Sequence, residues 1–181
     1  MAGQFFESVL QREAQNFSAL NGRGFIALQQ NRLPQSAADF EQSLAINPLQ
    51  PFAHKMLGIV LGAMGRFQAS MQAFEAALVL DAKDPEVYFN RANFRFQAGQ
   101  VQEALADLDQ AIQLRGSYLE ARSNRANLLV QLGDFARAEK DLDYLVTKVT
   151  HNPDLWVALG LARHKVGKHK EAMLCNARAL K

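Results

Sequence analysis

Two consecutive stretches decide the fold: residues 85–118 read PEVYFNRANFRFQAGQVQEALADLDQAIQLRGSY, and residues 119–152 read LEARSNRANLLVQLGDFARAEKDLDYLVTKVTHN. Both carry Asn-Arg-Ala-Asn in their first half and a glycine near their middle, 34 residues apart. The same spacing puts a residue that tolerates a left-handed turn at Asn31, Gly65, Gly99, Gly133 and Gly167. A fixed period of this length indicates a repeat architecture, so the chain is expected to consist of stacked copies of one unit.

Each unit predicts two amphipathic helices with the glycine in the turn between them. In the third unit, Ala104, Leu108 and Ala111 follow the spacing of one helix face. Counted from Phe17, Pro51, Pro85, Leu119 and Pro153, the eighth and twentieth places always hold small residues. The twenty-fourth place holds Phe40, Phe74, Leu108, Leu142 and Asn176. One helix hairpin cannot bury its own apolar stripe, so the units must stack, which predicts an all-α solenoid.

This repeat resembles the tetratricopeptide repeat (TPR) family in its 34-residue unit, its small eighth and twentieth places, its aromatic twenty-fourth place and its closing proline, Pro48. The resemblance implies a right-handed α-solenoid of stacked helix-turn-helix units. It covers residues 17–181 as five units, at 17–50, 51–84, 85–118, 119–152 and 153–181, the last of them incomplete. Residues 1–16 echo the second half of a unit in Ala2, Phe6 and Val9, and are expected to form one N-terminal capping helix.

The composition excludes several classes of protein. The 181 residues are 49% apolar and 21% charged with a formal net charge of +2, which is ordinary for a globular chain and unlike a disordered or fibrous one. No apolar run reaches the roughly 18 to 20 residues of a membrane span, so we expect no membrane partner. Cys175 is the only cysteine, which excludes an internal disulfide and fits a reducing compartment. We therefore expect a cytoplasmic protein.

Two places in the repeat are either both charged or both uncharged, and this pattern predicts ion pairs between the two helices of a unit. The predicted pairs join the seventh and twenty-third places of units one, three and four, and are Arg23 with Asp39, Arg91 with Asp107, and Arg125 with Asp141. Units two and five have neither charge, because the same places hold Leu57 with Ala73 and Leu159 with Cys175. Since both partners are exchanged together, we interpret the pairs as structural rather than as ligand anchors.

No motif predicts catalysis, a metal or a cofactor. Gly22-Arg23-Gly24 lacks the third glycine and the preceding strand of a phosphate-binding loop. His164 and His169 lie five residues apart across Gly167, so they do not share a helix face as paired metal ligands do at a spacing of four. Cys175 occupies an apolar place and is expected to be inert. We therefore predict that the chain is not an enzyme.

The family resemblance implies that defined places on the first helix of each unit line a concave groove. Units three and four repeat asparagines there, Asn90 with Asn93 and Asn124 with Asn127, continued by Gln97 and Gln131. These rows resemble the asparagine ladder of the O-GlcNAc transferase repeats, which implies a grip on the backbone of an extended peptide, since amides both donate and accept hydrogen bonds. The flanking groove residues are Phe52, Lys55, Met56, Ile59, Phe89, Val157 and Leu161.

The predicted function is a non-catalytic protein-protein interaction module, a scaffold or adaptor that binds a peptide or partner segment in this groove. The alternative is a substrate-recruiting arm of a larger enzyme such as a protein glycosyltransferase, and a third reading is an assembly protein that uses the edges of the stack. The carboxylate clamp of the family matches only at Lys55 and Asn90. Its other places hold Ile59, Glu120 and Asn124, and the acid would repel a carboxylate.

Unit five differs from the others in charge and in its outer helix. It has six basic residues, Arg163, Lys165, Lys168, Lys170, Arg178 and Lys181, against Asp154 and Glu171. Without interleaved aromatics or a longer basic stripe, we expect no nucleic-acid partner. The sequence stops within the second helix, so Leu174, Ala177 and Leu180 are expected to be partly uncovered. This predicts either a homo-oligomer formed through unit five or a continuation of the chain.

Overall fold

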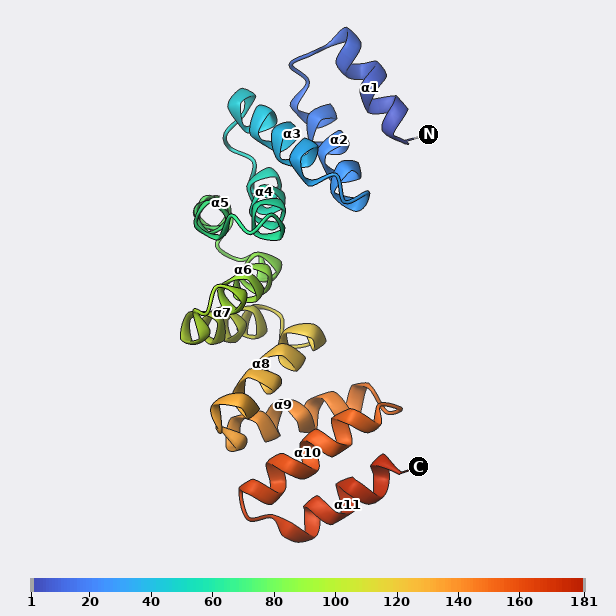
Figure 1. Cartoon of the computed structure of the whole chain (residues 1–181), viewed down its shortest axis with the longest axis vertical. Helices are drawn as coiled ribbons and strands as arrows, with labels where there is room; N and C mark the ends of the chain where they lie inside the picture. Colours follow the sequence, from blue (N-terminus) through green and yellow to red (C-terminus); the bar gives the residue numbers. More distant parts are fainter. Residues whose placement is uncertain (1, 181) are drawn as a thin grey trace. The chain divides into compact units, whose positions relative to one another are not determined.

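The structure is a computed structural model that describes residues 2–180, and every regular element in that range is an α-helix (Figure 1). The chain divides into two compact units between Gln100 and Val101. The first holds α1 (Ala2–Arg12), α2 (Phe17–Gln29), α3 (Leu33–Ile46), α4 (Pro51–Ala63), α5 (Phe67–Leu80) and α6 (Pro85–Gln97). The second holds α7 (Val101–Leu114), α8 (Leu119–Leu132), α9 (Phe135–Lys148), α10 (Pro153–Lys165) and α11 (His169–Ala179).

The turn within each helix pair has the backbone conformation that the sequence predicts. Asn31, Gly65, Gly99, Gly133 and Gly167 have φ angles of 57°, 75°, 79°, 78° and 84°. Side chains with a Cβ rarely adopt this left-handed region, which explains glycine at four of the turns and asparagine at the fifth. The prediction that the periodic glycines form the turns between the two helices of each unit is therefore confirmed.

Helix starts follow the sequence as well. Proline occupies the first position of α4, α6 and α10, where a missing backbone N–H costs nothing. Asp84 and Asn152 precede two of these prolines, and their side chains accept hydrogen bonds from backbone N–H groups of the first turn. Asn16 caps α2 in the same manner by accepting from Ala19 N. Local sequence therefore sets where these helices begin.

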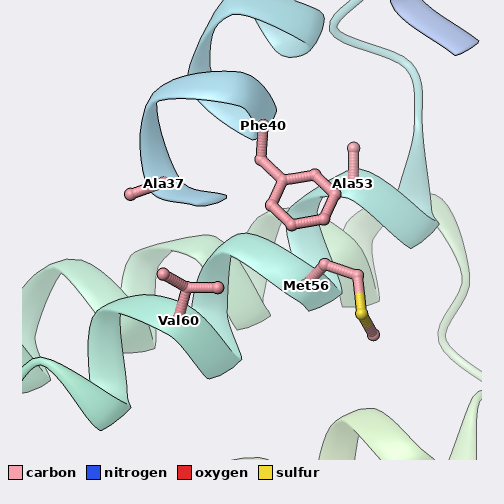
Figure 2. Packing of buried hydrophobic residues seen from close by; sticks show 5 residues of the cluster. All are labelled: Ala37, Phe40, Ala53, Met56 and Val60. Atoms are coloured by element: carbon pink, nitrogen blue, oxygen red, sulfur yellow. The ribbon is translucent and has the colours of Figure 1, made fainter. Parts of the chain in front are cut away.

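In the first compact unit, small residues allow close approach of helices and phenylalanines fill the space beside them. A Cβ on Gly58 would lie 2.8 Å from the Phe74 ring, and Ser70 Oγ donates a 2.6 Å hydrogen bond to Gly58 O. The junction between α3 and α4 is apolar. Figure 2 shows the Phe40 ring of α3 directed at α4, where Ala53 and Met56 lie. Successive helix pairs are thus joined by continuous apolar packing.

The second compact unit repeats this packing up to its last helix. Ala104, Leu108 and Ala111 of α7 are buried, and Leu142 of α9 is only 2% exposed. In α11 only Ala172 and Cys175 are buried, whereas Asn176 is exposed. The polar residue at the twenty-fourth place removes the large apolar side chain that anchors the second helix elsewhere. No helix among residues 2–180 combines the length and the apolar character needed to cross a membrane.

Candidate protein-binding site

The first helices of three successive pairs lie beside one another in the first compact unit, because α2 contacts α4 and α4 contacts α6. Two large aromatic side chains are exposed where α2 meets α4. Phe25 is 39% exposed and Phe52 is 44% exposed, and their ring centroids lie 6.4 Å apart. Phe52 also packs against the buried Phe40 ring at 6.4 Å, edge to face. This contact holds Phe52 in place while one side of its ring stays open to a partner.

Phe25 and the neighbouring Asn21 were missing from the residues predicted to bind a partner. They occupy the ninth and fifth places of unit one, so applying the groove rule to that unit would have found both. Asn21 Nδ2 donates a 2.7 Å hydrogen bond to Gln50 Oε1, and Gln50 Nε2 donates to Ser43 O at 3.1 Å. Gln50 therefore links the residues of α2 and α3 just before α4 begins.

The three groove residues predicted on α4 besides Phe52 have different surroundings. Met56 was predicted to line the groove, and this prediction is corrected. The residue is only 8% exposed and packs with Phe40 and Val60 in the core, so it offers little surface to a partner. Met56 lies on the side of α4 that faces α3, where it packs with Phe40. Ile59 is partly buried between the two apolar clusters of this unit.

Lys55 is held by acidic residues of the same compact unit. Its Nζ donates hydrogen bonds to Asp84 at 2.8 Å and Glu86 at 3.0 Å, and 12% of its side chain is exposed. Burial alone would lower the pKa of Lys55, but its hydrogen bonds to Asp84 and Glu86 raise the pKa above its usual value. Asn90 Nδ2 donates to Glu86 O at 2.7 Å. Both residues that match the carboxylate clamp are therefore engaged within the chain.

The remaining predicted residues of α6 differ in exposure. Phe89 and Asn93 are half-buried, whereas Gln97 is exposed at the helix end. In the second compact unit, Asn124 of α8 is half-buried and Asn127 and Gln131 are exposed. Of the predicted amides, the side chains most accessible to a partner are thus Gln97, Asn127 and Gln131.

Apolar residues of α10 are exposed in the second compact unit. Val157 is 53% exposed and Leu161 is 43% exposed, and α10 packs against α9, as α8 does. The exposed amides of α8 and the exposed apolar side chains of α10 therefore lie on two helices that both pack against α9. Each compact unit thus carries apolar and amide groups on its first helices.

The structure places two of the three predicted ion pairs within hydrogen-bonding distance. Arg23 donates to both Asp39 oxygens, at 3.0 Å from Nε and 2.6 Å from Nη2. Arg125 donates to both Asp141 oxygens at 2.7 Å. The carboxylates are 4% and 0% exposed, so these pairs brace the inside of a helix hairpin. Arg91 and Asp107 belong to different compact units, and their pairing stays a prediction.

The Arg125 guanidinium belongs to a wider network that the repeat comparison missed. It also donates to Asp109 of α7 at 2.8 Å, and Arg137 of α9 donates to the same carboxylate at 2.8 Å. Arg122 donates a further 2.8 Å bond to Asp141. Asp109 follows Asp107 by two residues and therefore points to another side of α7, toward the next helix pair. The network joins α7, α8 and α9.

A second network joins α9, α10 and α11. Arg163 donates to Asp143 at 2.6 Å and to Glu139 at 3.3 Å, and Lys168 donates to Glu139 at 2.9 Å. Burial raises the pKa of the Asp143 carboxyl above its usual value, although the Arg163 charge opposes this effect. Arg163 Nη1 also lies 3.2 Å from the buried Cys175 sulfur. These charges stabilise the stacking of helix pairs rather than forming an open charged site.

Of the residues considered for metal binding, two histidines of unit five lie close together. The turn between α10 and α11 brings His164 and His169 together with their Nδ1 atoms 3.0 Å apart, although the sequence places them on different helices. No third histidine, cysteine or carboxylate joins them, since residues 2–180 contain no group of three such ligands.

Family comparisons agree with this architecture. The tetratricopeptide repeat family model matches residues 55–118 and 123–181, and a second model of the same repeat matches residues 95–143. Cell division cycle protein 27 homolog B of Arabidopsis thaliana is 32% identical over 78 residues, which is 43% of this chain and 10% of that protein. The match thus spans about a tenth of the length of that curated relative.

Solved structures share the fold at low sequence identity. YrrB, described as a TPR protein with an unusual peptide-binding site, superimposes with a TM-score of 0.81 at 16% identity, over 99% of this chain and 92% of YrrB. MamA has a TM-score of 0.80 at 18% identity, over 92% and 91% of the two chains. PilF of Pseudomonas aeruginosa has a TM-score of 0.74 at 19% identity, over 94% and 77%. The chain belongs to the tetratricopeptide repeat family and has the α-solenoid fold of that family, which is the architecture of a protein-interaction scaffold.

Proposed function

We propose that this protein is a non-catalytic scaffold that binds an extended peptide segment of a partner protein along the first helices of its repeats. The observation that carries the proposal is the exposed aromatic pair Phe25 and Phe52, 39% and 44% exposed with ring centroids 6.4 Å apart. Aromatic side chains, phenylalanine included, are enriched at protein interfaces relative to the rest of the surface. The fold similarity to YrrB, which has a peptide-binding site, supports the proposal.

The amides contribute orientation rather than affinity in this account. A net contribution of about 0.5–1.5 kcal/mol for each hydrogen bond falls short of an association cost of about 4–15 kcal/mol when only a few amides take part. The apolar anchors Phe25 and Phe52 supply the missing affinity, and Gln97 of the same compact unit contacts the backbone of the bound segment. We expect dissociation constants in the micromolar range.

The experiment begins with a phage-displayed library of random peptides that is selected on the full chain. Enriched peptides are then synthesised and titrated by fluorescence anisotropy. The Phe25→Ala, Phe52→Ala double variant should weaken binding by about 2 kcal/mol or more, or about thirtyfold. The matched control is Val79→Ala, which removes an 85% exposed apolar side chain from the second helix α5. Equal affinity of the double variant and the control would overturn the proposal.

The other functions predicted from the sequence lead to different results. A substrate-recruiting arm of a larger enzyme would use the same residues, so it stays a prediction that this experiment does not address. An assembly protein that uses only the edges of the stack would select no peptide that depends on Phe25 or Phe52. The location in the cytoplasm also stays a prediction.

A further inference from the structure

The turn between α10 and α11 brings two imidazole rings together at the surface. His164 lies in the last turn of α10 and His169 is the first residue of α11, and Gly167 between them has a φ angle of 84°. The two Nδ1 atoms are 3.0 Å apart, and the ring centroids are 4.8 Å apart. Both residues are exposed and line an open hollow between the two helices. Two ring nitrogens that face each other within reach of solvent are the arrangement that a metal ion needs.

The separation of the two nitrogens fits one ion that binds both. Imidazole nitrogens bind metals at about 2.0–2.1 Å, so two nitrogens 3.0 Å apart subtend an angle of roughly 90–97° at such an ion. This angle is nearer to the roughly 90° of a tetragonal site than to the roughly 109° of a tetrahedral one. Tetragonal coordination by nitrogen and oxygen ligands is typical of Cu²⁺ and Ni²⁺. The distance therefore favours these ions over Zn²⁺.

The two rings can bind an ion without a change in their charge. As a hydrogen bond between neutral rings, the 3.0 Å contact requires one ring to donate its Nδ1–H to the Nδ1 lone pair of the other. When an ion is bound, both neutral rings carry their hydrogen on Nε2, and both Nδ1 lone pairs bind the metal. The ion thus replaces one hydrogen bond by two coordinate bonds.

The surroundings of the pair also favour a transition metal with water as its other ligands. Among residues 2–180, no histidine, cysteine or carboxylate joins the two rings as a third ligand. The hollow that both histidines line has a volume of about 510 Å³, so it has room for several water molecules. Ca²⁺ and Mg²⁺ take oxygen ligands and do not suit two imidazoles. Among divalent first-row metals, Cu²⁺ binds a given set of nitrogen ligands most tightly.

An ion between the two rings would hold a helix that has few other anchors. In α11 the buried residues are Ala172 and Cys175, and the exposed Asn176 takes the place of a large apolar side chain. His164 and His169 stand on opposite sides of the turn, so an ion that binds both ties α11 to α10. Because the open hairpin separates the two ligands, the ion stabilises the closed form.

We propose that His164 and His169 bind one divalent transition-metal ion, Cu²⁺ most tightly, and that the bound ion fixes α11 against α10. The two Nδ1 atoms are the protein ligands, and water fills the other positions. This site lies in the second compact unit, whereas the aromatic pair Phe25 and Phe52 lies in the first. The metal site is therefore independent of the proposed peptide-binding surface.

The test measures Cu²⁺ binding to the full chain without a polyhistidine tag. Equilibrium dialysis against Cu²⁺, with glycine as a competing ligand, followed by atomic emission gives the number of ions bound and their affinity. We expect one Cu²⁺ for each chain, and weaker binding of Ni²⁺. Electron paramagnetic resonance of the bound Cu²⁺ should show hyperfine coupling to two imidazole nitrogens.

Variants locate the site among the four histidines of the chain. His164→Ala and His169→Ala should each weaken Cu²⁺ binding by at least about tenfold, because each leaves a single imidazole ligand. The matched control is His54→Ala combined with His151→Ala, which removes two imidazoles elsewhere and should leave the affinity unchanged. Circular dichroism checks that every variant keeps its helical content.

Hydrogen exchange measured by mass spectrometry tests the effect of the ion on the hairpin. With Cu²⁺ at about 100 times its dissociation constant, exchange of α11 amides should slow by up to about a hundredfold. Exchange of α5 amides should not change. The His164→Ala variant should show no slowing in α11, because it keeps only one of the two ligands.

Three results would overturn the proposal. The first is wild-type affinity for Cu²⁺ no higher than that of the His164→Ala, His169→Ala double variant. The second is a loss of binding in the His54→Ala, His151→Ala control, which would place the ion elsewhere. The third is a bound ion that leaves exchange in α11 unchanged, which would show that it does not hold the two helices together.

Discussion

Arg125 and Asp141 are joined by two hydrogen bonds of 2.7 Å, and Arg122 adds a third bond to the same carboxylate at 2.8 Å. The equivalent pair in unit one joins Asp39 to the single guanidinium of Arg23 through two hydrogen bonds. Both carboxylates are buried. The two copies of one motif therefore differ in how many cations compensate the buried negative charge.

This difference predicts unequal effects of removing the arginine. Arg23→Leu leaves the buried Asp39 without the cation that binds it, and should lower the free energy of unfolding by about 3–5 kcal/mol. Arg125→Leu should cost less, because Arg122 still compensates Asp141. Urea unfolding of both variants measures the difference, and equal costs would contradict the assigned role of Arg122. A double-mutant cycle of Arg125→Leu with Asp141→Ala should show coupling between the partners.

The same design tests the predicted pair of Arg91 and Asp107. Arg91→Leu and Asp107→Ala, separately and combined, should show a coupling energy if the two side chains interact as the repeat predicts. Additive costs would show that Arg91 and Asp107 are not partners.

Gly62 is expected to resist replacement although it lies within a helix. Alanine normally favours a helix over glycine by about 1 kcal/mol. A Cβ on Gly62 would, however, lie 2.6 Å from the Phe94 ring, so Gly62→Ala should destabilise by about 1–3 kcal/mol through overpacking. Thermal unfolding monitored by circular dichroism checks this. Adding Phe94→Leu should reduce the cost of Gly62→Ala, whereas a stabilising Gly62→Ala would show that the ring moves freely away.

Asp143 should titrate above the ordinary aspartate value of 3.8, because burial of its carboxyl outweighs the nearby Arg163 charge. Arg163→Ala should raise this pKa further, and carbon-detected NMR titration of the carboxyl measures both values. The folded carboxyl binds its proton more tightly than the unfolded one. Its contribution to stability is therefore greatest below the unfolded pKa and is lost as the pH rises through the raised folded pKa. A pKa below 3.8 in the wild-type protein would contradict the assignment.

Met56 and Phe52 should have opposite effects when truncated. Met56 is buried with Phe40, so Met56→Ala should cost about 2–5 kcal/mol of stability and leave peptide affinity unchanged in the folded protein. Phe52→Ala should reduce peptide affinity with a smaller loss of stability, since 44% of the residue is exposed. Urea unfolding and peptide titration of the two variants separate the effects. A loss of affinity confined to Met56→Ala would reverse the two assignments.

The sequence predicts the repeat, its turns and the partners of the ion pairs because these depend on residues at fixed spacing. Gly65 and Asn31 illustrate this. Each stands at a turn that requires a left-handed backbone, a conformation that glycine and asparagine tolerate whatever surrounds them. Site residues are harder to predict because their availability depends on neighbouring helices. Lys55 reads as an exposed groove cation, but Asp84 and Glu86 approach it from about 30 residues away and bind its ammonium group.

The same dependence on neighbouring elements explains which site residues and contacts were not predicted. Phe25 stands at the same groove place of unit one as Ile59 in unit two and Leu161 in unit five, so the groove rule finds Phe25 when it is applied to unit one. His164 and His169 meet only because the turn at Gly167 folds α11 back against α10. Contacts made across a turn follow from the path of the backbone rather than from spacing along one helix.

Intermolecular NOEs between a selected peptide and the phenylalanine rings show whether Phe25 and Phe52 contact the bound peptide. We expect NOEs from the peptide to the ring protons of both residues. NOEs from the peptide to side chains of second helices such as Val79, with none to Phe25 or Phe52, would contradict it.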